Sequence, residues 1–347
     1  MKKVLVVATS PKSRGGIATV VNALRETDVW SEHKCCWVAT HIDRSKLHKA
    51  IKLLVGLLKY IVLLPWYDIV HIHLSTTVSA NRKYIFYKMA RLFRKKVVVH
   101  LHCGSQLSEI WSSKYEDMFR NSSMCIVLSN SIREMIVART GKADNVRVVY
   151  NPSPSGVVVP KSEERNKVIL FAATLYREKG YLDLIEAFAL IAPKYPDWKL
   201  VLAGNGSQER GLGKAMQLRV GNRVEFVGWV RGAEKDRVFR SASIFCLPSY
   251  AEGFPMAVLD AWAYGLPVVT TPVGGVPDIV VDGENGLLFT PGDVATLANK
   301  LSMLIESEEL RATISKESLH LANTTFNVNT IANELANIYK DIYGTKK

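Results

Sequence analysis

Residues 146–174 read VRVVYNPSPSGVVVPKSEERNKVILFAAT, and this stretch indicates how the whole chain is divided. Two short runs rich in valine and isoleucine, each typical of a buried strand, flank a segment of prolines and serines that ends in charged residues. Proline and serine at this density favour an irregular connection over a helix or a strand. Residues 151–166 are therefore predicted to link two domains, for which a chain of 347 residues is long enough.

On both sides of this linker, short apolar runs alternate with stretches of amphipathic helical pattern. Strands are predicted at 3–9, 67–73, 95–102, 124–129 and 146–151, and after the linker at 168–174, 199–204, 224–229, 243–248 and 267–272. Continuous apolar strands separated by helices predict parallel sheets covered on both faces. We expect an α/β protein with two doubly wound, Rossmann-like domains, 1–150 and 167–325, and ligands in the cleft between them, where strands end.

The last stretch, FNVNTIANELANIYKDIYG at 326–344, has the pattern of an amphipathic helix rich in isoleucine, leucine and tyrosine. A helix here, within the C-terminal segment 326–347, could complete the second domain or cross back to the first. The sequence pattern fits both of these arrangements.

Composition excludes several classes of protein. Hydrophobic residues make up 48 % of the chain and charged residues 22 %, which excludes collagen-like, disordered and disulfide-scaffold proteins. The cysteines are odd in number and form no CxxC pair, so we expect idle thiols in a reducing compartment; they are Cys35, Cys36, Cys103, Cys125 and Cys246. The apolar run at residues 4–8 is shorter than an export signal requires, and we expect a cytoplasmic protein.

The excess positive charge is confined to the first half of the chain. Residues 1–155 contain 24 Lys and Arg against 10 Asp and Glu, whereas residues 156–347 contain 21 against 22. This asymmetry predicts an anionic partner for the first domain: nucleic acid, lipid head groups or a phosphorylated substrate.

The most specific pattern is SYAEGFPMAVLDAWAYGLPVVTTPVGGVPDIV at 249–280. Glu252 precedes Pro255, a residue favoured in the first turn of a helix, and residues 256–264 are predicted to form that helix. Free backbone N–H groups at its start favour a phosphate. Asp260 lies about two turns further on, so the two carboxylates could bind hydroxyl groups of two rings. On spacing alone, a capped core helix with a solvent-facing Asp260 fits equally well.

This block resembles the donor site of the family 4 retaining glycosyltransferases, whose two Rossmann-like domains form the GT-B fold. The family pattern places a second Glu eight residues after the first, and here that position holds Asp260. The resemblance implies that Glu252 contacts the donor sugar and Asp260 the ribose. It also places in the donor site the residues that start the helix, namely Gly253, Phe254, Pro255, Met256, Ala257 and Val258.

The resemblance covers nearly the whole chain. Within ILFAATLYREKGYLDLIEAFA at 169–189, Lys179 matches the lysine that neutralises the donor diphosphate. Thr174 stands where the family has an arginine, and Arg177 is expected to compensate. Val230 matches the residue whose backbone contacts the base. Residues 274–293 match a final strand and loop, which we interpret as mainly architectural.

In the first domain, the resemblance implies that Gly15 and Gly16 form a loop meeting the donor phosphates or the acceptor. It also implies that His102 touches the donor sugar, although Cys103 precedes Gly104 where the family has a His-Gly pair. His71 and His73 are expected to be hydrogen-bonded structural histidines. We expect no metal and no cofactor, because the family's cations are lysine, arginine and helix dipoles.

Residues 45–68, SKLHKAIKLLVGLLKYIVLLPWYD, combine lysines every three residues with a leucine-rich body and terminal aromatics. The apolar run is too short to span a bilayer. It is typical of a helix lying in a membrane interface, and it fits a helix packed in the core of the first domain equally well.

The resemblance implies a retaining hexosyltransferase that uses a UDP- or GDP-linked sugar. The basic first domain favours a lipid-linked glycan acceptor at the inner face of the plasma membrane, in bacterial-type surface polysaccharide or lipopolysaccharide synthesis, with no nucleic acid. Two alternatives are a GT-B nucleotide-sugar epimerase, which the EGFPMAVLD block at 252–260 disfavours, and a basic lipid- or nucleic-acid-binding protein whose donor site is idle.

Overall fold

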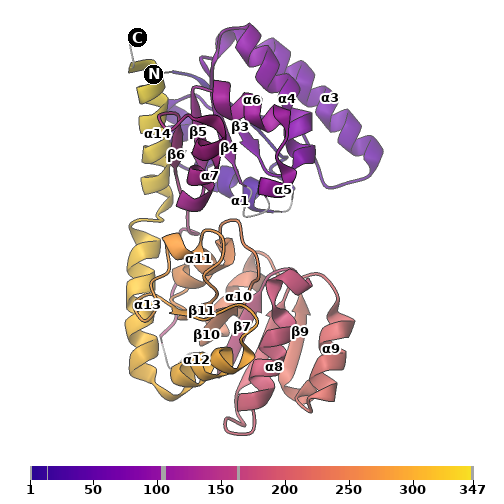
Figure 1. The fold of residues 1–347 in the computed structure, drawn as a ribbon, viewed down its shortest axis with the longest axis vertical. Helices are drawn as coiled ribbons and strands as arrows, with labels where there is room; N and C mark the ends of the chain where they lie inside the picture. The colour runs from indigo at the N-terminus through magenta and orange to yellow at the C-terminus, as the bar shows by residue number, and fades with distance from the viewer. Residues whose placement is uncertain (1, 14, 103–106, 162–164, 345–347) are drawn as a thin grey trace. The chain divides into compact units, whose positions relative to one another are not determined.

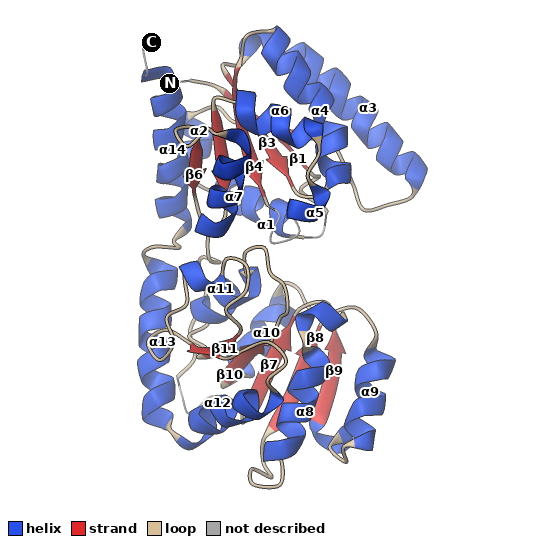
Figure 2. Ribbon diagram, viewed as in Figure 1, coloured by secondary structure: helices blue, strands red, loops and turns tan. Residues whose placement is uncertain are grey.

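A computed structural model of the chain describes residues 2–13, 15–102, 107–161 and 165–344 (Figures 1 and 2). Cys103, which interrupts the family's His-Gly pattern, and Gly104 lie outside the described residues. The chain divides into two compact units. Unit 1 comprises Met1–Pro152 with Val328–Lys347, and unit 2 comprises Ser153–Asn327.

Unit 1 contains a six-stranded sheet in the order β2-β1-β3-β4-β5-β6, in which every pair is parallel. Its strands are β1 (Val4–Ala8), β2 (Cys36–Ala39), β3 (Ile69–Leu74), β4 (Lys96–Leu101), β5 (Met124–Val127) and β6 (Val146–Val148). Its helices are α1 (Gly16–Arg25), α2 (Asp28–Glu32), α3 (Lys46–Leu63), η1 (Leu64–Trp66), α4 (Thr77–Leu92), α5 (Leu107–Ile110), α6 (Ser113–Asn121), α7 (Asn130–Thr140) and α14 (Val328–Gly344).

Unit 2 contains a second parallel six-stranded sheet, in the order β12-β11-β10-β7-β8-β9. Its strands are β7 (Val168–Ala172), β8 (Lys199–Ala203), β9 (Val224–Gly228), β10 (Ile244–Leu247), β11 (Val268–Thr270) and β12 (Leu287–Leu288). Its helices are η3 (Arg177–Lys179), α8 (Tyr181–Ile191), α9 (Gln208–Gln217), η4 (Gly221–Arg223), α10 (Ala233–Ser241), α11 (Met256–Ala263), η5 (Val276–Asp278), α12 (Val294–Glu306) and α13 (Glu308–Asn323).

The predicted parallel sheets are confirmed, and burial explains which strands the pattern identified. Every residue of β1 and β3 is buried, as expected of strands covered on both faces. The pattern did not predict β2, in which only Val38 is fully buried. As the edge strand of its sheet, β2 lacks the continuous apolar run that marks a central strand.

The last helix, α14, packs within unit 1, against α1 and α2. Its inward face includes Ile331, Leu335 and Tyr339, all of which are buried. The Tyr339 hydroxyl lies 2.7 Å from Nδ1 of His71 on the central strand β3. The chain therefore returns to its first unit after completing the second, one of the two arrangements that the sequence left open.

Helix α3 packs on unit 1 through one face only. Gly56 and Tyr60 are its buried residues, and the Tyr60 hydroxyl donates to the carbonyl of Phe86 over 2.7 Å. A Cβ on Gly56 would lie 2.5 Å from the carbonyl oxygen of Ala39 at the end of β2. None of the helices in the described ranges is both long enough and apolar enough to cross a membrane.

Gly56→Ala is expected to destabilise the protein, although glycine to alanine in a helix normally stabilises by about 1 kcal/mol. The new methyl group must push α3 away from β2, and such overpacking costs about 1–3 kcal/mol. Gly213→Ala is the matched control, because Gly213 is also helical, in α9, and nothing lies within 4 Å of its Cβ position. Thermal unfolding should show a lower midpoint for Gly56→Ala and an equal or higher one for Gly213→Ala; the same sign for both would contradict this packing.

Candidate functional site

The carboxyl edge of the unit 2 sheet brings together two of the predicted site residues. The Lys179 ammonium lies 2.6 Å from Oε1 of Glu252 and donates to the Ala251 carbonyl over 3.3 Å. The same carboxylate oxygen accepts from the Ser249 hydroxyl over 2.6 Å. The Glu252 side chain is 9 % exposed and that of Lys179 is 25 % exposed, so the lysine is the more accessible partner.

Backbone contacts between loops hold this ion pair in place. Lys179 ends the short helix that follows β7, and Glu252 lies in the loop between β10 and α11. The amide of Tyr250 donates to the Glu178 carbonyl over 2.8 Å, which ties the two loops together. Gly274 adopts φ +60°, and a Cβ there would lie 2.0 Å from the carbonyl oxygen of Glu252. Only glycine fits that position without displacing the loop that carries Glu252.

Helix α11 begins directly beside the ion pair. Pro255 is its N-cap, one position earlier than the predicted first turn, and the helix covers Met256–Ala263. No side chain in the described residues caps its first turn, so its N-terminal dipole is available to an anion. Gly253 lies between Glu252 and this helix, where its carbonyl accepts from the amide of Gly275 over 3.0 Å.

The helix also positions the second predicted carboxylate. Phe254 and Val258 are buried while Met256 and Ala257 are partly exposed, so the first turn is anchored on one side. Asp260 is 20 % exposed, and its Oδ1 lies 2.7 Å from the ammonium of Lys235 on α10. The solvent-facing Asp260 that spacing alone allowed is therefore wrong, because this carboxylate is paired and mostly buried.

Three other predicted residues lie at ends of strands in the same sheet. Thr174 and Arg177 are exposed and follow β7, and Val230 is partly buried two residues after β9. The positive charge of Arg177 acts on Tyr250, whose pKa is nevertheless raised, mainly because its hydroxyl donates to Asp183 over 2.6 Å. Arg177 is therefore near the loop that carries Glu252.

Sequence reasoning missed Ser249 and Lys235, which complete the two carboxylate sites. Ser249 lies within the conspicuous motif, so its position three residues before Glu252 was a usable signal. Lys235 had none, because it lies on a separate helix with an ordinary charged pattern.

The remaining predicted residues belong to unit 1. Gly15 caps α1 with φ 107°, and nothing lies within 4 Å of its Cβ position, while Gly16 is the first residue of the helix. His102 follows β4, with its Nε2 2.9 Å from Nδ1 of His73. The predicted hydrogen-bonded roles of His71 and His73 are confirmed. Nδ1 of His102 is buried and has no partner in the described residues.

Four histidines form a stack: two on β3, one on β4, and His102 just after β4. His73 pairs with His100 across the strands, and ring centroids lie 4.4 Å apart for His71 and His73 and 4.2 Å apart for His100 and His102. Burial lowers the pKa of His71 and of His102 to about 3, so these rings are neutral. The nitrogens of His71, His73 and His100 lie close enough to hold a cation, but nearly parallel rings direct their in-plane lone pairs side by side, which disfavours convergence on one ion.

The four described cysteines are free thiols. The pKa of Cys35 is raised to about 12, mainly by burial. Burial also raises the pKa of the Cys125 and Cys246 thiols. Such thiols are poor nucleophiles, in keeping with the idle role expected for them.

Two protein-family models match the chain. The family described as "Glycosyl transferases group 1" matches residues 158–320 in unit 2. The family described as "Glycosyltransferase Family 4" matches residues 13–153 in unit 1.

Among curated proteins, an uncharacterized glycosyltransferase of Haemophilus influenzae is 34 % identical over 182 residues, 51 % of this chain and 50 % of that protein. The lipopolysaccharide 1,6-galactosyltransferase of Salmonella typhimurium is 28 % identical over 200 residues, 56 % of each chain. The chain thus spans about half the length of these two relatives. The crystal structure of Anabaena HepE in complex with UDP-glucose matches with a TM-score of 0.77 and 22 % identity, over 98 % of this chain and 100 % of that one. These matches establish a two-domain α/β fold of the GT-B type.

Proposed function

The chain belongs to the glycosyltransferases of group 1 and family 4, and we propose that it is a retaining hexosyltransferase that uses a nucleotide-diphosphate sugar. The observation that carries the proposal is the Lys179–Glu252 ion pair beside the uncapped start of α11. A cation and a helix N-terminus suit a diphosphate, and an adjacent carboxylate suits sugar hydroxyls.

In this proposal, the protein stabilises the leaving group. The acceptor oxygen attacks the anomeric carbon on the face from which the diphosphate departs, so the new glycosidic bond forms where the old C–O bond breaks. The acceptor proton passes to an oxygen of the departing diphosphate. Lys179 and the start of α11 counter the charge that develops there, and such stabilisation lowers the barrier because it is strongest in the transition state.

The ion pair gives Glu252 two roles. It orients the donor sugar, and in the absence of donor it neutralises Lys179 over 2.6 Å. A diphosphate must therefore share the lysine with Glu252. Asp260 would bind the ribose, held in position by Lys235, while Thr174, Arg177 and Val230 line the remaining strand ends.

For the nucleotide and the acceptor, the comparisons suggest starting points. The Anabaena protein was crystallised with UDP-glucose, which supports UDP as the first nucleotide to test. The Salmonella relative is named as a lipopolysaccharide galactosyltransferase, which supports a glycan of surface polysaccharide or lipopolysaccharide as acceptor. Calorimetric titration with UDP and GDP, followed by a hydrolysis screen of nucleotide sugars, separates this enzyme from a binding protein whose donor site is idle.

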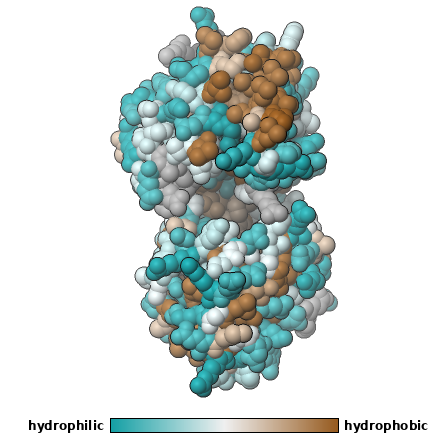
Figure 3. All heavy atoms as spheres, turned by 90° about the vertical axis from the view of Figure 1, so that its right-hand side faces the viewer, coloured by the Kyte–Doolittle hydropathy of each residue, from teal (hydrophilic) through white to brown (hydrophobic). Residues whose placement is uncertain are grey.

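We also propose that unit 1 binds an anionic membrane through α3, at the inner face of the plasma membrane. Seven apolar side chains and Trp66 are exposed along this helix and its end, and Figure 3 shows hydrophobic side chains gathered on this part of the surface. The seven are Leu47, Ile51, Leu54, Val55, Leu58, Ile61 and Val62, each at least 45 % exposed. At 100° per residue they form one stripe, opposite the buried Gly56 and Tyr60. A basic domain with an exposed apolar stripe suits an anionic bilayer.

The lysines of α3 are arranged differently from the apolar stripe. Lys46 and Lys52 lie about 120° from its centre, so they would contact lipid phosphates at its margins. Lys49 lies about 180° from the centre, on the side of the buried Gly56 and Tyr60. Lys59 donates to the carbonyl of Trp37 over 2.9 Å, which gives it a structural role. Of these four lysines, we therefore expect Lys46 and Lys52 to contact the membrane.

Replacing either member of the ion pair is expected to impair catalysis with opposite effects on nucleotide binding. Lys179→Ala should weaken UDP binding and turnover by about 10–150-fold, the value of a charge-assisted contact. Glu252→Gln should lower turnover similarly while UDP binds as tightly or more tightly, because Lys179 loses its competing partner. Calorimetry and donor hydrolysis measure both; weaker UDP binding in Glu252→Gln would remove that residue from the sugar side.

Activity is expected to survive removal of divalent metal, because protein cations would hold the diphosphate. Donor hydrolysis after exhaustive dialysis against EDTA should match the untreated protein. Loss of activity that magnesium or manganese restores would contradict the proposal.

The wild-type protein is expected to sediment with anionic vesicles at low salt and poorly with neutral ones, since each interfacial lysine contributes about 1 kcal/mol. The double variant Lys46/Lys52→Glu and the triple variant Leu54/Leu58/Val62→Ser should each release it with an unchanged thermal midpoint. The matched control is Leu190/Met216/Val281→Ser in unit 2, whose side chains are also exposed and should leave vesicle binding intact. Equal loss in the control, or no wild-type binding, would show that α3 is not the contact.

A further inference from the structure

Two adjacent cations on α4, Arg82 and Lys83, take no part in the donor site. Lys83 is fully buried, and its ammonium donates to the His73 carbonyl and to the Ser79 hydroxyl, the latter over 3.2 Å. Both acceptors are neutral. Arg82 is partly buried, and its Nε is shielded from solvent without a hydrogen-bond partner in the described residues.

Neither cation has a carboxylate partner in the described part of the chain. Burial is the main cause that lowers the pKa of Lys83 to about 7, and the charge of Arg82 is the second. Burial also lowers the pKa of Arg82. A buried charge without a counter-charge is costly to the folded protein. A bound anion would neutralise the charge of Arg82 and favour the protonated form of Lys83.

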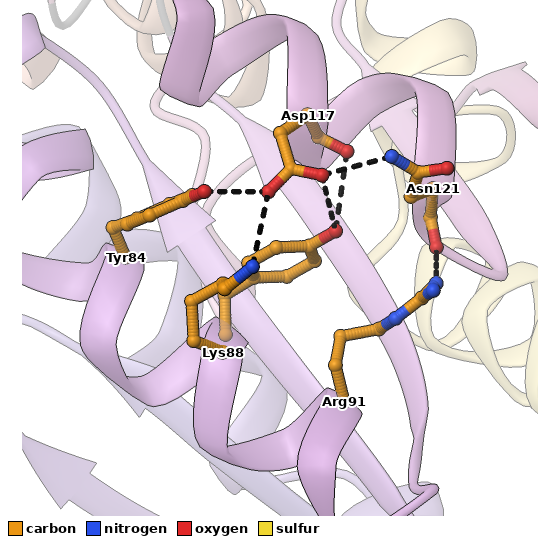
Figure 4. Close-up of polar contacts among 6 residues, drawn as sticks. Tyr84, Lys88, Arg91, Asp117 and Asn121 are labelled. Atoms are coloured by element: carbon orange, nitrogen blue, oxygen red, sulfur yellow. Dashed lines mark hydrogen bonds and ion pairs between the residues drawn. The ribbon is translucent and has the colours of Figure 1, made fainter.

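Two cations in the second half of the same helix, Lys88 and Arg91, have polar contacts that Figure 4 shows. Lys88 lies 4.0 Å from the Asp117 carboxylate, which also accepts from Tyr84 over 2.6 Å. Arg91 donates to the carbonyl of Asn121. Lys88, in the second half of α4, thus has a carboxylate partner, whereas Arg82 and Lys83 in the first half have none in the described residues.

That first half lies at the ligand-binding edge of the unit 1 sheet. The strand order β2-β1-β3 makes β1 and β3 the neighbours at which the chain reverses its direction of winding, where open α/β sheets bind ligands. The charge of Lys83 acts on His102 at the end of β4, and that of Arg82 acts on His41 after β2. The nearby carboxylate, Asp43, lies 3.4 Å from His41.

We propose that Arg82, with Lys83 behind it, binds a phosphate group of the acceptor. Arginine offers several N–H donors in a fixed fork that matches phosphate oxygens, and two adjacent cations suit a group that carries up to two negative charges. Lys83 is fully buried, so it would contribute its positive charge without contacting the phosphate at the surface. The assignment of this phosphate to the acceptor rests on the proposed function; the anion site itself does not.

The test is phosphate-induced thermal stabilisation of the whole chain with saturating UDP, at constant ionic strength set by chloride. A ligand that binds only the folded state raises the midpoint, and we expect a rise of several degrees in 50 mM inorganic phosphate. Arg82→Gln should lose at least three quarters of this rise, and Arg82→Lys should keep part of it. The matched control Lys88→Gln removes the same charge from the same helix and should keep all of it.

A purely structural role for Arg82 predicts a different result. Arg82→Gln would then lower the midpoint without phosphate, whereas our proposal expects that midpoint to stay or rise, because an unpartnered charge has been removed. A wild-type chain that phosphate does not stabilise, or a rise that survives in Arg82→Gln, would overturn the inference.

Two further probes identify the source of the phosphate. Stabilisation by glucose 1-phosphate indicates a sugar phosphate, and stabilisation by dihexanoyl phosphatidic acid below its micelle concentration indicates a lipid phosphate. A response to inorganic phosphate alone would overturn the assignment to an acceptor. UDP-induced stabilisation and donor hydrolysis, measured in the same variants, report on the donor site independently; their failure in the wild type would refute the proposed function and leave the anion site standing.

Discussion

Parallel pairing is the constraint on which the rest of this protein depends. In both sheets every described strand pair is parallel, so each strand must be followed by a crossover before the next begins. All carboxyl ends of a sheet therefore meet at one edge. That edge collects Lys179 and Glu252 from positions 73 residues apart in the chain, and in unit 1 it collects His41, His102 and the start of α4.

The carboxyl edges of the two sheets differ in whether their cations are paired with carboxylates. In unit 2, two lysines of the predicted donor site each have a carboxylate at hydrogen-bond distance, Lys179 with Glu252 and Lys235 with Asp260. In unit 1, Arg82 and Lys83 have none in the described residues. A paired site tolerates the absence of its ligand, while an unpaired site loses stability until an anion arrives. The excess positive charge of the first half of the chain is thus partly concentrated at a place where it is costly to the fold.

Helix α3 presents two different faces. Its buried face is narrow, because Gly56 allows the backbone to approach β2 and Tyr60 reaches the carbonyl of Phe86. The opposite face carries the exposed apolar stripe. Apolar residues occur on both the buried and the exposed face of this helix. A core helix and an interfacial helix therefore fitted the sequence equally well. Its two faces became distinguishable only once the sheet beneath it was in place.

Local patterns in the sequence were enough to predict the alternation of strands and helices, and they also predicted a linker and the acids and lysine of a donor motif. These signals are local: apolar runs, proline and serine content, and the spacing of Glu252, Pro255 and Asp260. Tertiary structure alone decided that Lys179 meets Glu252, that Lys235 holds Asp260, that α14 packs against His71 through Tyr339, and that Arg82 has no described partner. Each depends on which distant segments share a sheet edge or a helix face, and composition and spacing carry no information about those contacts.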